Sequence, residues 1–189
     1  MHLLFRSPNP DLYRFLVGLN VKNDETDFQG RNPFLISTQN FSGQPMSEPM
    51  QDLLSKNVRF DLADSKGRTP FLIYYEHQNQ QMANQLLDKG ANINAMDQGG
   101  LFALKYALIR RNDSELQRLC DMGANINQLD NNRRNLLHHA VNMSSATADA
   151  TFETEQVLID LGVDINAKDC RERVPLHYAF VKINNWRNK

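Results

Sequence analysis

The hydrophobic residues in the middle of the chain occur in two short groups separated by polar residues. The first group follows Pro70 and occupies residues 71–75. The second contains Leu86 and Leu87 and lies shortly before Gly90. Pro70 favours the first turn of a helix, because its φ is already helical and its missing N–H has no partner to lose there. We predict that Leu86 and Leu87 face inward on a second, antiparallel helix that Gly90 ends in the left-handed conformation.

A polar turn precedes this pair of helices. Asp64 begins the turn, because its carboxylate can accept a hydrogen bond from the backbone N–H two residues on. Gly67 supplies the positive φ that the turn requires. Each unit is therefore a turn, a helix and a second helix. Such a unit cannot bury its apolar face alone, so we expect its stability to come from stacking on neighbouring units.

The same unit recurs at a nearly fixed spacing. Thirty-three positions separate Asp64 from Asp97, and thirty-three more separate Asp97 from Asp130. Near-identical octets lie in register with these aspartates: Gly90-Ala-Asn-Ile-Asn-Ala-Met-Asp97, Gly123-Ala-Asn-Ile-Asn-Gln-Leu-Asp130 and Gly162-Val-Asp-Ile-Asn-Ala-Lys-Asp169. A period in this range is typical of a solenoid.

These residues resemble the ankyrin repeat, whose pattern runs Asp-x-x-Gly-x-Thr-Pro-Leu-His-x-Ala and ends Gly-Ala-Asp-Val-Asn-Ala. The resemblance implies an all-α fold, an ankyrin-repeat solenoid of stacked helix–turn–helix units with short β-turn fingers. It covers residues 1–189 as a single domain. We divide that domain into a partial repeat at 2–26, repeats at 27–63, 64–96, 97–129 and 130–168, and a partial repeat at 169–189.

Some repeats depart from the family pattern. In the unit that begins at Asp97, residues 100–103 read Gly-Leu-Phe-Ala where Thr and Pro are expected, which predicts a poorer start for the helix that follows. Long loops at 40–47 and 142–151 lengthen two units, and tolerated insertion is the simpler interpretation of them. The last unit stops after one helix, near Trp186, and from this we expect the chain to be a segment of something longer, although an unusual C-terminal cap would explain the ending equally well.

Composition and charge narrow the class of protein. The chain is 41% apolar and 23% charged, which is ordinary for a soluble globular protein. Its net charge of −1 argues against bulk attraction to nucleic acid or to a membrane. No run approaches the roughly 18 apolar residues of a membrane span. Cys120 and Cys170 fall in different repeats, so we expect reduced thiols and an intracellular protein of the cytoplasm or nucleus. We also expect a monomer.

Residues that suggest catalysis or metal binding each have a structural explanation. His138 and His139 are adjacent on a predicted helix and point about 100° apart, so they cannot converge on one ion without a third ligand. His138 and His177 occupy the histidine place of the family pattern, where the imidazole forms hydrogen bonds within the repeat. The turn aspartates recur once per repeat, too far apart to act on one bond. We therefore expect no enzyme activity, no cofactor and no metal in this chain.

Binding is the function that the resemblance implies, because partners of ankyrin repeats lie along a concave groove formed by the turn tips and the inner-helix face. Arginine recurs just after the glycine place in most copies, and arginine grips carboxylates bidentately. We therefore predict a protein or peptide partner, with acidic character as one interpretation and a generic solvated face as the other. The predicted partner-binding residues are Arg31, Lys66, Arg68, Arg110, Asn131, Arg134, Met143, Arg171 and Arg173.

The sequence leaves two functions open. The first is a non-catalytic protein interaction module. The second is a regulatory or targeting segment of a larger multidomain enzyme, because Arg134-Asn-Leu-Leu-His-His-Ala-Val and Val174-Pro-Leu-His-Tyr-Ala-Phe-Val-Lys-Ile resemble ankyrin regions attached to some poly(ADP-ribose) polymerases. No catalytic residue is carried over from that resemblance.

Overall fold

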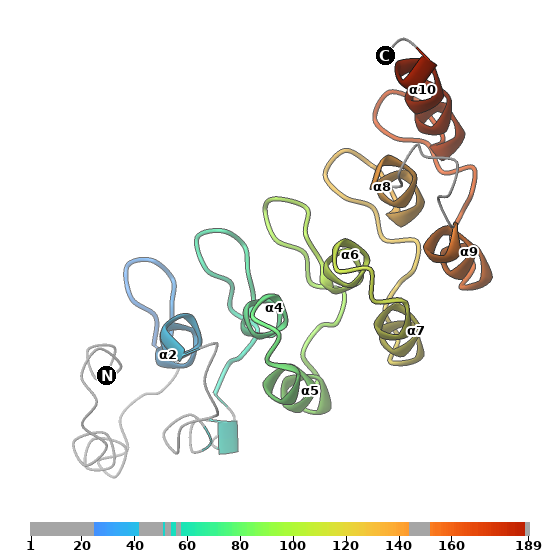
Figure 1. Ribbon diagram of the computed structural model, residues 1–189. Helices are drawn as coiled ribbons and strands as arrows, with labels where there is room; N and C mark the ends of the chain where they lie inside the picture. Colours follow the sequence, from blue (N-terminus) through green and yellow to red (C-terminus); the bar gives the residue numbers. More distant parts are fainter. Residues whose placement is uncertain (1–24, 42–50, 52–53, 56–57, 144–151, 188–189) are drawn as a thin grey trace, which may run out of the picture. The chain divides into compact units, whose positions relative to one another are not determined.

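The computed structural model describes residues 25–41, 51, 54–55, 58–143 and 152–187. The chain forms two compact units, Met1–Gln98 and Gly99–Lys189, and each is described by itself. The helices of the first unit are α2 (Pro33–Phe41), α4 (Pro70–Glu76) and α5 (Gln80–Asp88). Those of the second unit are α6 (Ala103–Ile109), α7 (Asp113–Asp121), α8 (Leu136–Met143), α9 (Glu153–Asp160) and α10 (Pro175–Arg187) (Figure 1). Nearly all of the predicted repeat at 2–26 and of the loops at 40–47 and 142–151 lies outside the described residues.

The helical hairpin predicted around Pro70 is present in the first unit. Pro70 begins α4, and the Thr69 hydroxyl caps the helix by accepting the N–H of Leu72 at 3.4 Å. Residues 70–75 are all buried, because α2 packs on one side of α4 and α5 on another. A helix that is apolar all round needs such cover on several faces, which only neighbouring helices can give.

The second unit repeats this design in the hairpins α6–α7 and α8–α9. The start of α6 is poorer, as predicted, because Phe102 stands at the cap position and makes no side-chain cap hydrogen bond. The side chain of Asn112 caps α7 by accepting the N–H of Glu115 at 3.1 Å.

Leucines at equivalent places anchor the three outer helices α5, α7 and α9. Leu86, Leu119 and Leu158 are each fully buried. The carbonyl of each leucine accepts the N–H of the residue five positions on, at 2.9, 2.9 and 3.0 Å, which is the Schellman helix end with a left-handed glycine. The hydrophobic pattern therefore places the same side chain in the same role on successive hairpins.

The helix α10 shows how far each repeat depends on the next. Leu137 on α8 is 6% exposed because α10 packs against α8. Leu176 holds the equivalent place on α10 and is 61% exposed. A neighbouring helix therefore buries the side chain at this position, and the repeat that carries the side chain does not. In the described parts of the chain, no helix combines the length and apolar character needed to cross a bilayer.

Candidate functional site

The five-residue turns that begin at the repeated aspartates project beside the helices that follow them, and we call them fingers. In the finger 64–68, Oδ1 of Asp64 accepts the backbone N–H groups of Lys66 and Arg68, each at 2.9 Å. Oδ2 accepts the Arg68 guanidinium through Nε at 3.0 Å and Nη2 at 2.8 Å. The N–H of Gly67 donates to the Asp64 carbonyl at 2.8 Å. One carboxylate therefore organises the whole turn.

The same closure recurs in three further fingers. The nearest nitrogen–oxygen distances are 2.7 Å for Arg31–Asp27, 2.8 Å for Arg134–Asp130 and 2.8 Å for Arg173–Asp169. Burial alone would raise the pKa of each aspartate, but the backbone and arginine hydrogen bonds outweigh burial and hold the pKa well below its usual range. These carboxylates stay ionised and hold the fingers in one shape.

This closure bears on the arginines predicted to face an acidic partner. The side chains of Arg31, Arg68, Arg134 and Arg173 are 19–38% exposed, and each is paired with the aspartate of its own finger. Much of their positive charge is therefore matched locally. The other predicted residues differ, since Lys66, Arg110, Asn131 and Arg171 are exposed and Met143 is half-buried at the end of α8. A partner-binding role for all nine residues stays a prediction.

Polar side chains link neighbouring fingers in the first unit. Nη1 of Arg31 donates to Oε1 of Gln39 at 3.3 Å, and Nε2 of Gln39 donates to Oδ2 of Asp64 at 3.3 Å. The backbone N–H of Gln98 donates to the carbonyl of Lys66 at 2.9 Å. The fingers of this unit are therefore tied to one another as well as closed on themselves.

Asp130 collects donors from two repeats of the second unit. Its Oδ2 lies 2.9 Å from Nε2 of His139 and 3.5 Å from Nζ of Lys105, besides the Arg134 pair. Lys105 belongs to α6 of the preceding repeat and also donates to the Gly100 carbonyl at 3.1 Å. Sequence reasoning missed Lys105. The available signal was one charged residue inside the otherwise uncharged helix Ala103–Ile109, since a buried lysine needs an anion or a carbonyl beside it.

His138 joins two repeats of the second unit. It is 1% exposed, and its Nε2 lies 3.0 Å from the carbonyl oxygen of Arg173 in the next finger. A carbonyl can only accept, so Nε2 donates to it, and Nδ1 lies 2.7 Å from Oδ1 and 3.3 Å from the backbone nitrogen of Asn135 in its own repeat. The expected structural role of His138 is confirmed, and it extends to the neighbouring repeat. The N–H of Cys170 adds a bond to the carbonyl of Asn132 at 2.9 Å.

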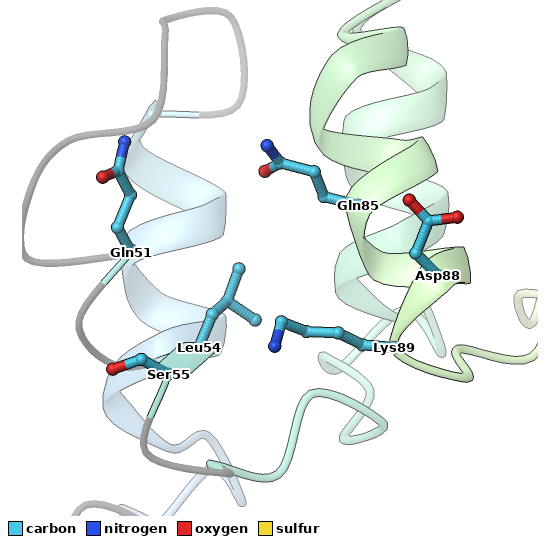
Figure 2. Close-up of a pocket in the computed structure, with 6 residues that line it drawn as sticks. All are labelled: Gln51, Leu54, Ser55, Gln85, Asp88 and Lys89. Atoms are coloured by element: carbon cyan, nitrogen blue, oxygen red, sulfur yellow. The ribbon is translucent and has the colours of Figure 1, made fainter.

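The described residues offer no site for a metal ion and one notable hollow. Among them, no three His, Cys, Asp or Glu side chains are grouped so as to hold a metal. A cavity of about 420 Å³ in the first unit has Gln51, Leu54 and Ser55 on one side and Gln85, Asp88 and Lys89 on the other (Figure 2). Oε1 of Gln85 is buried there and has no hydrogen-bond partner among the residues that the structure describes. None of the nine predicted partner-binding residues lines this cavity.

Acid is expected to weaken the fold through His139 and the turn aspartates. Burial, Lys105 and Arg134 together lower the pKa of His139 to about 4, despite the opposing effect of Asp130. The unfolded chain therefore binds this proton more tightly, and the His139 contribution is complete above about pH 6.5 and lost as the pH falls towards 4. As the pH falls below about 4, the turn aspartates of the unfolded chain take up protons before those of the folded chain, because their folded pKa values are depressed, and this removes more stability.

We expect the free energy of unfolding to fall by roughly 2 kcal/mol or more between pH 7 and pH 4. Urea unfolding at a series of pH values measures this slope. In His139→Gln the loss over the same interval should be smaller, and an equal slope in that variant would contradict the role given to His139.

The repeated segments of the chain match a known family. A model described as ankyrin repeats (three copies) matches residues 39–130 and 76–169. The chain is also similar to the ankyrin repeat protein FPV244 of fowlpox virus, with 31% identity over 104 residues. That match covers 55% of this chain and 14% of the viral protein, so the chain corresponds to a small part of that relative.

Two solved structures share the fold. The ankyrin repeat domain of Bcl-3, a member of the IkappaB protein family, aligns with a TM-score of 0.69 and 22% identity, over 98% of this chain and 80% of that one. A chain in the complex of the predatory endopeptidase Bd0816 from Bdellovibrio bacteriovorus with the immunity protein Bd3460 aligns with a TM-score of 0.70 and 18% identity, over 97% and 91%. At these identities the likeness concerns the fold, and it confirms the predicted all-α ankyrin-repeat solenoid.

Proposed function

Because the chain belongs to the ankyrin repeat family, whose repeats are protein–protein interaction modules, we propose that it binds a segment of a partner protein through its fingers and the ends of its inner helices. The inner helices are those that follow a finger, namely α2, α4, α6, α8 and α10. The nine residues predicted from the sequence lie on these elements or directly at their ends, and none of them is buried.

The observation that carries this proposal is the contrast between the base and the tip of each finger. At the base of four fingers, the aspartate is held by backbone N–H groups and by an arginine. At the tip, the two residues after the aspartate are exposed in all five fingers, and Phe28 reaches 95% exposure. A rigid base that presents exposed side chains at its tip loses little backbone conformational entropy on binding, which favours association.

Photo-cross-linking from the finger tips tests the proposal. A benzophenone amino acid is placed at Lys66 or Arg171, both exposed at tips, and as a matched control at Gln117 or Gln156, both exposed on outer helices. We expect a partner adduct from the tip positions and little from the outer helices. Equal adducts from both sets would contradict the proposal.

Charge reversal at the tips gives the second measurement. Lys66→Glu and Arg171→Glu leave the finger closures in place, and each is expected to weaken partner binding by about 1 kcal/mol, roughly fivefold. Arg134→Glu and Arg173→Glu are less informative, because the new carboxylate would lie beside Asp130 or Asp169 and open the finger. Unchanged affinity in both tip variants would exclude the tips as contact points.

The role as a segment of a larger enzyme, such as a poly(ADP-ribose) polymerase, is the second proposal that the sequence carries. It is compatible with the first, since a binding module can direct a catalytic domain in the same polypeptide. The sequence of the parent gene on both sides of this chain tests it directly.

A further inference from the structure

We propose that the tips of the fingers 130–134 and 169–173 form one cationic contact site for a carboxylate-rich segment of the partner, with Arg133 and Arg171 as the contact residues. This inference rests on the proposed function and names the chemistry of the partner at that surface. It differs from the sequence prediction, which gave weight to the arginines that close the fingers and did not include Arg133.

The first observation is the backbone at Arg133. The glycine place has φ values of +74° at Gly30, +77° at Gly67 and +74° at Gly100, and Glu172 holds it in the finger 169–173 with φ +60°. Arg133 holds the same place with φ +58°, a left-handed conformation that is unfavourable for any residue with a Cβ. Glycine would fit both turns better, so the fingers 130–134 and 169–173 each carry a charged side chain at a cost in backbone strain. Residues held in such conformations cluster at functional sites.

The second observation is that the two fingers are adjacent at their tips. The N–H of Cys170 donates to the carbonyl of Asn132 at 2.9 Å, and Arg133 and Arg171 directly follow these two bonded residues. Both arginines are exposed. Neither guanidinium forms a hydrogen bond or an ion pair with the described residues, whereas Arg134 and Arg173 are paired with Asp130 and Asp169. Their charge is therefore available to a partner.

The third observation is the balance of charge around these tips. The stretches 130–134 and 168–173 contain five basic side chains against three acidic ones. Asp130 and Asp169 are buried and closed by their own arginines, with Lys105 and His139 also facing Asp130 and Tyr178 facing Asp169. Glu172 pairs with Lys168 at 2.9 Å. Glu172 also attracts Arg133 without forming an ion pair with it, and the net charge left on this surface is positive, at Arg133 and Arg171.

A carboxylate-rich segment is the chemistry that fits two free guanidinium groups. Each guanidinium presents parallel N–H donors that match the two oxygens of a carboxylate. Glutamate side chains on one extended segment can reach both arginines, because the fingers that carry them are joined by a backbone hydrogen bond. Ion pairs at such an exposed surface weaken with added salt, which gives the site a measurable signature.

The test uses the full chain and a polyglutamate peptide as the probe, with a polyglutamine peptide of equal length as the uncharged control. We expect Arg133→Gly and Arg171→Ala each to weaken polyglutamate binding about fivefold, with loss of salt dependence in the double variant. Lys89→Ala removes one exposed charge from the first unit and should leave binding unchanged. Glu172→Gly removes the acidic side chain of the same surface and should strengthen binding.

Arg133→Gly also separates contact from structure. Because glycine relieves the left-handed strain, this variant should unfold at a higher urea concentration than the parent while it binds the peptide more weakly. A structural role for Arg133 would instead make stability and binding fall together. Absence of polyglutamate binding by the parent chain, or equal weakening by Lys89→Ala, overturns the proposal.

Failure here is distinguishable from failure of the proposed function. If partner adducts from the tips persist at full yield in Arg133→Gly/Arg171→Ala, the fingers bind a partner but do not select carboxylates. If the tips give no adducts at all, the proposed function fails whatever the peptide shows.

Discussion

Replacing Asp130 with alanine is expected to lower the free energy of unfolding by about 3–5 kcal/mol. The side chain is only 2% exposed and accepts from Arg134, His139 and Lys105, and from the backbone N–H groups of Asn132 and Arg134. Alanine removes the carboxylate that Lys105 contacts, and the side chain of Lys105 is itself only 9% exposed. It also leaves the backbone N–H groups of Asn132 and Arg134 without their acceptor. A buried charge that loses its partner destabilises more than the pair stabilised.

The same substitution at Asp164 is the matched control. Asp164 also accepts the N–H of the residue two positions on, at 2.9 Å, but it is exposed and forms no ion pair with the described part of the chain. We expect Asp164→Ala to change stability by about 0.5–1 kcal/mol. Asp130→Asn, which keeps an acceptor and loses the charge, should fall between the two.

Urea or thermal unfolding at neutral pH measures all three variants. A loss at Asp130 no larger than the loss at Asp164 would show that the donors around Asp130 do not hold the second unit together.

Gly67→Ala is expected to destabilise the first unit by about 2–3 kcal/mol. Gly67 has φ +77°, where any Cβ is strained. A Cβ at this place would also lie 2.9 Å from the backbone nitrogen of Gln98, the atom that donates to the Lys66 carbonyl of the neighbouring finger. The substitution therefore strains the turn at residues 64–68 and weakens the hydrogen bond between Gln98 and Lys66.

Gly90→Ala separates these two effects. Gly90 has φ +91°, and nothing lies within 4 Å of the Cβ that alanine would add. We expect a loss of about 1 kcal/mol from backbone strain alone. Differential scanning calorimetry of both variants gives the comparison, and equal losses would mean that the approach of Gln98 has no influence on stability.

The local parts of the fold could be predicted because each depends on neighbours in sequence. The turn at Asp64 follows from a carboxylate and an N–H two residues apart, and the structure shows that bond. The start of α4 at Pro70 and the poor start of α6 depend on a few adjacent residues. The periodic leucines Leu86, Leu119 and Leu158 then place three outer helices without reference to any long-range contact.

The candidate site was predicted less well because its chemistry depends on residues far apart in sequence. Arginine after the glycine was recognised as a repeated feature, but its pairing with the turn aspartate was not. That pairing moves the free positive charge from Arg134 and Arg173 to Arg133 and Arg171. Lys105 reaches Asp130 across 25 positions, and His138 reaches Arg173 across 35, so no local pattern identifies the partner of either residue.

By itself, the sequence determined the repeat, its turn chemistry and the family, because a period of thirty-three residues and the turn residues that mark it are local properties of the chain. The tertiary structure decided which charged side chains form ion pairs within the protein and which remain exposed. Side chains from successive repeats meet only when the repeats stack, and stacking is what puts Lys105 and His139 on the carboxylate that Arg134 also holds.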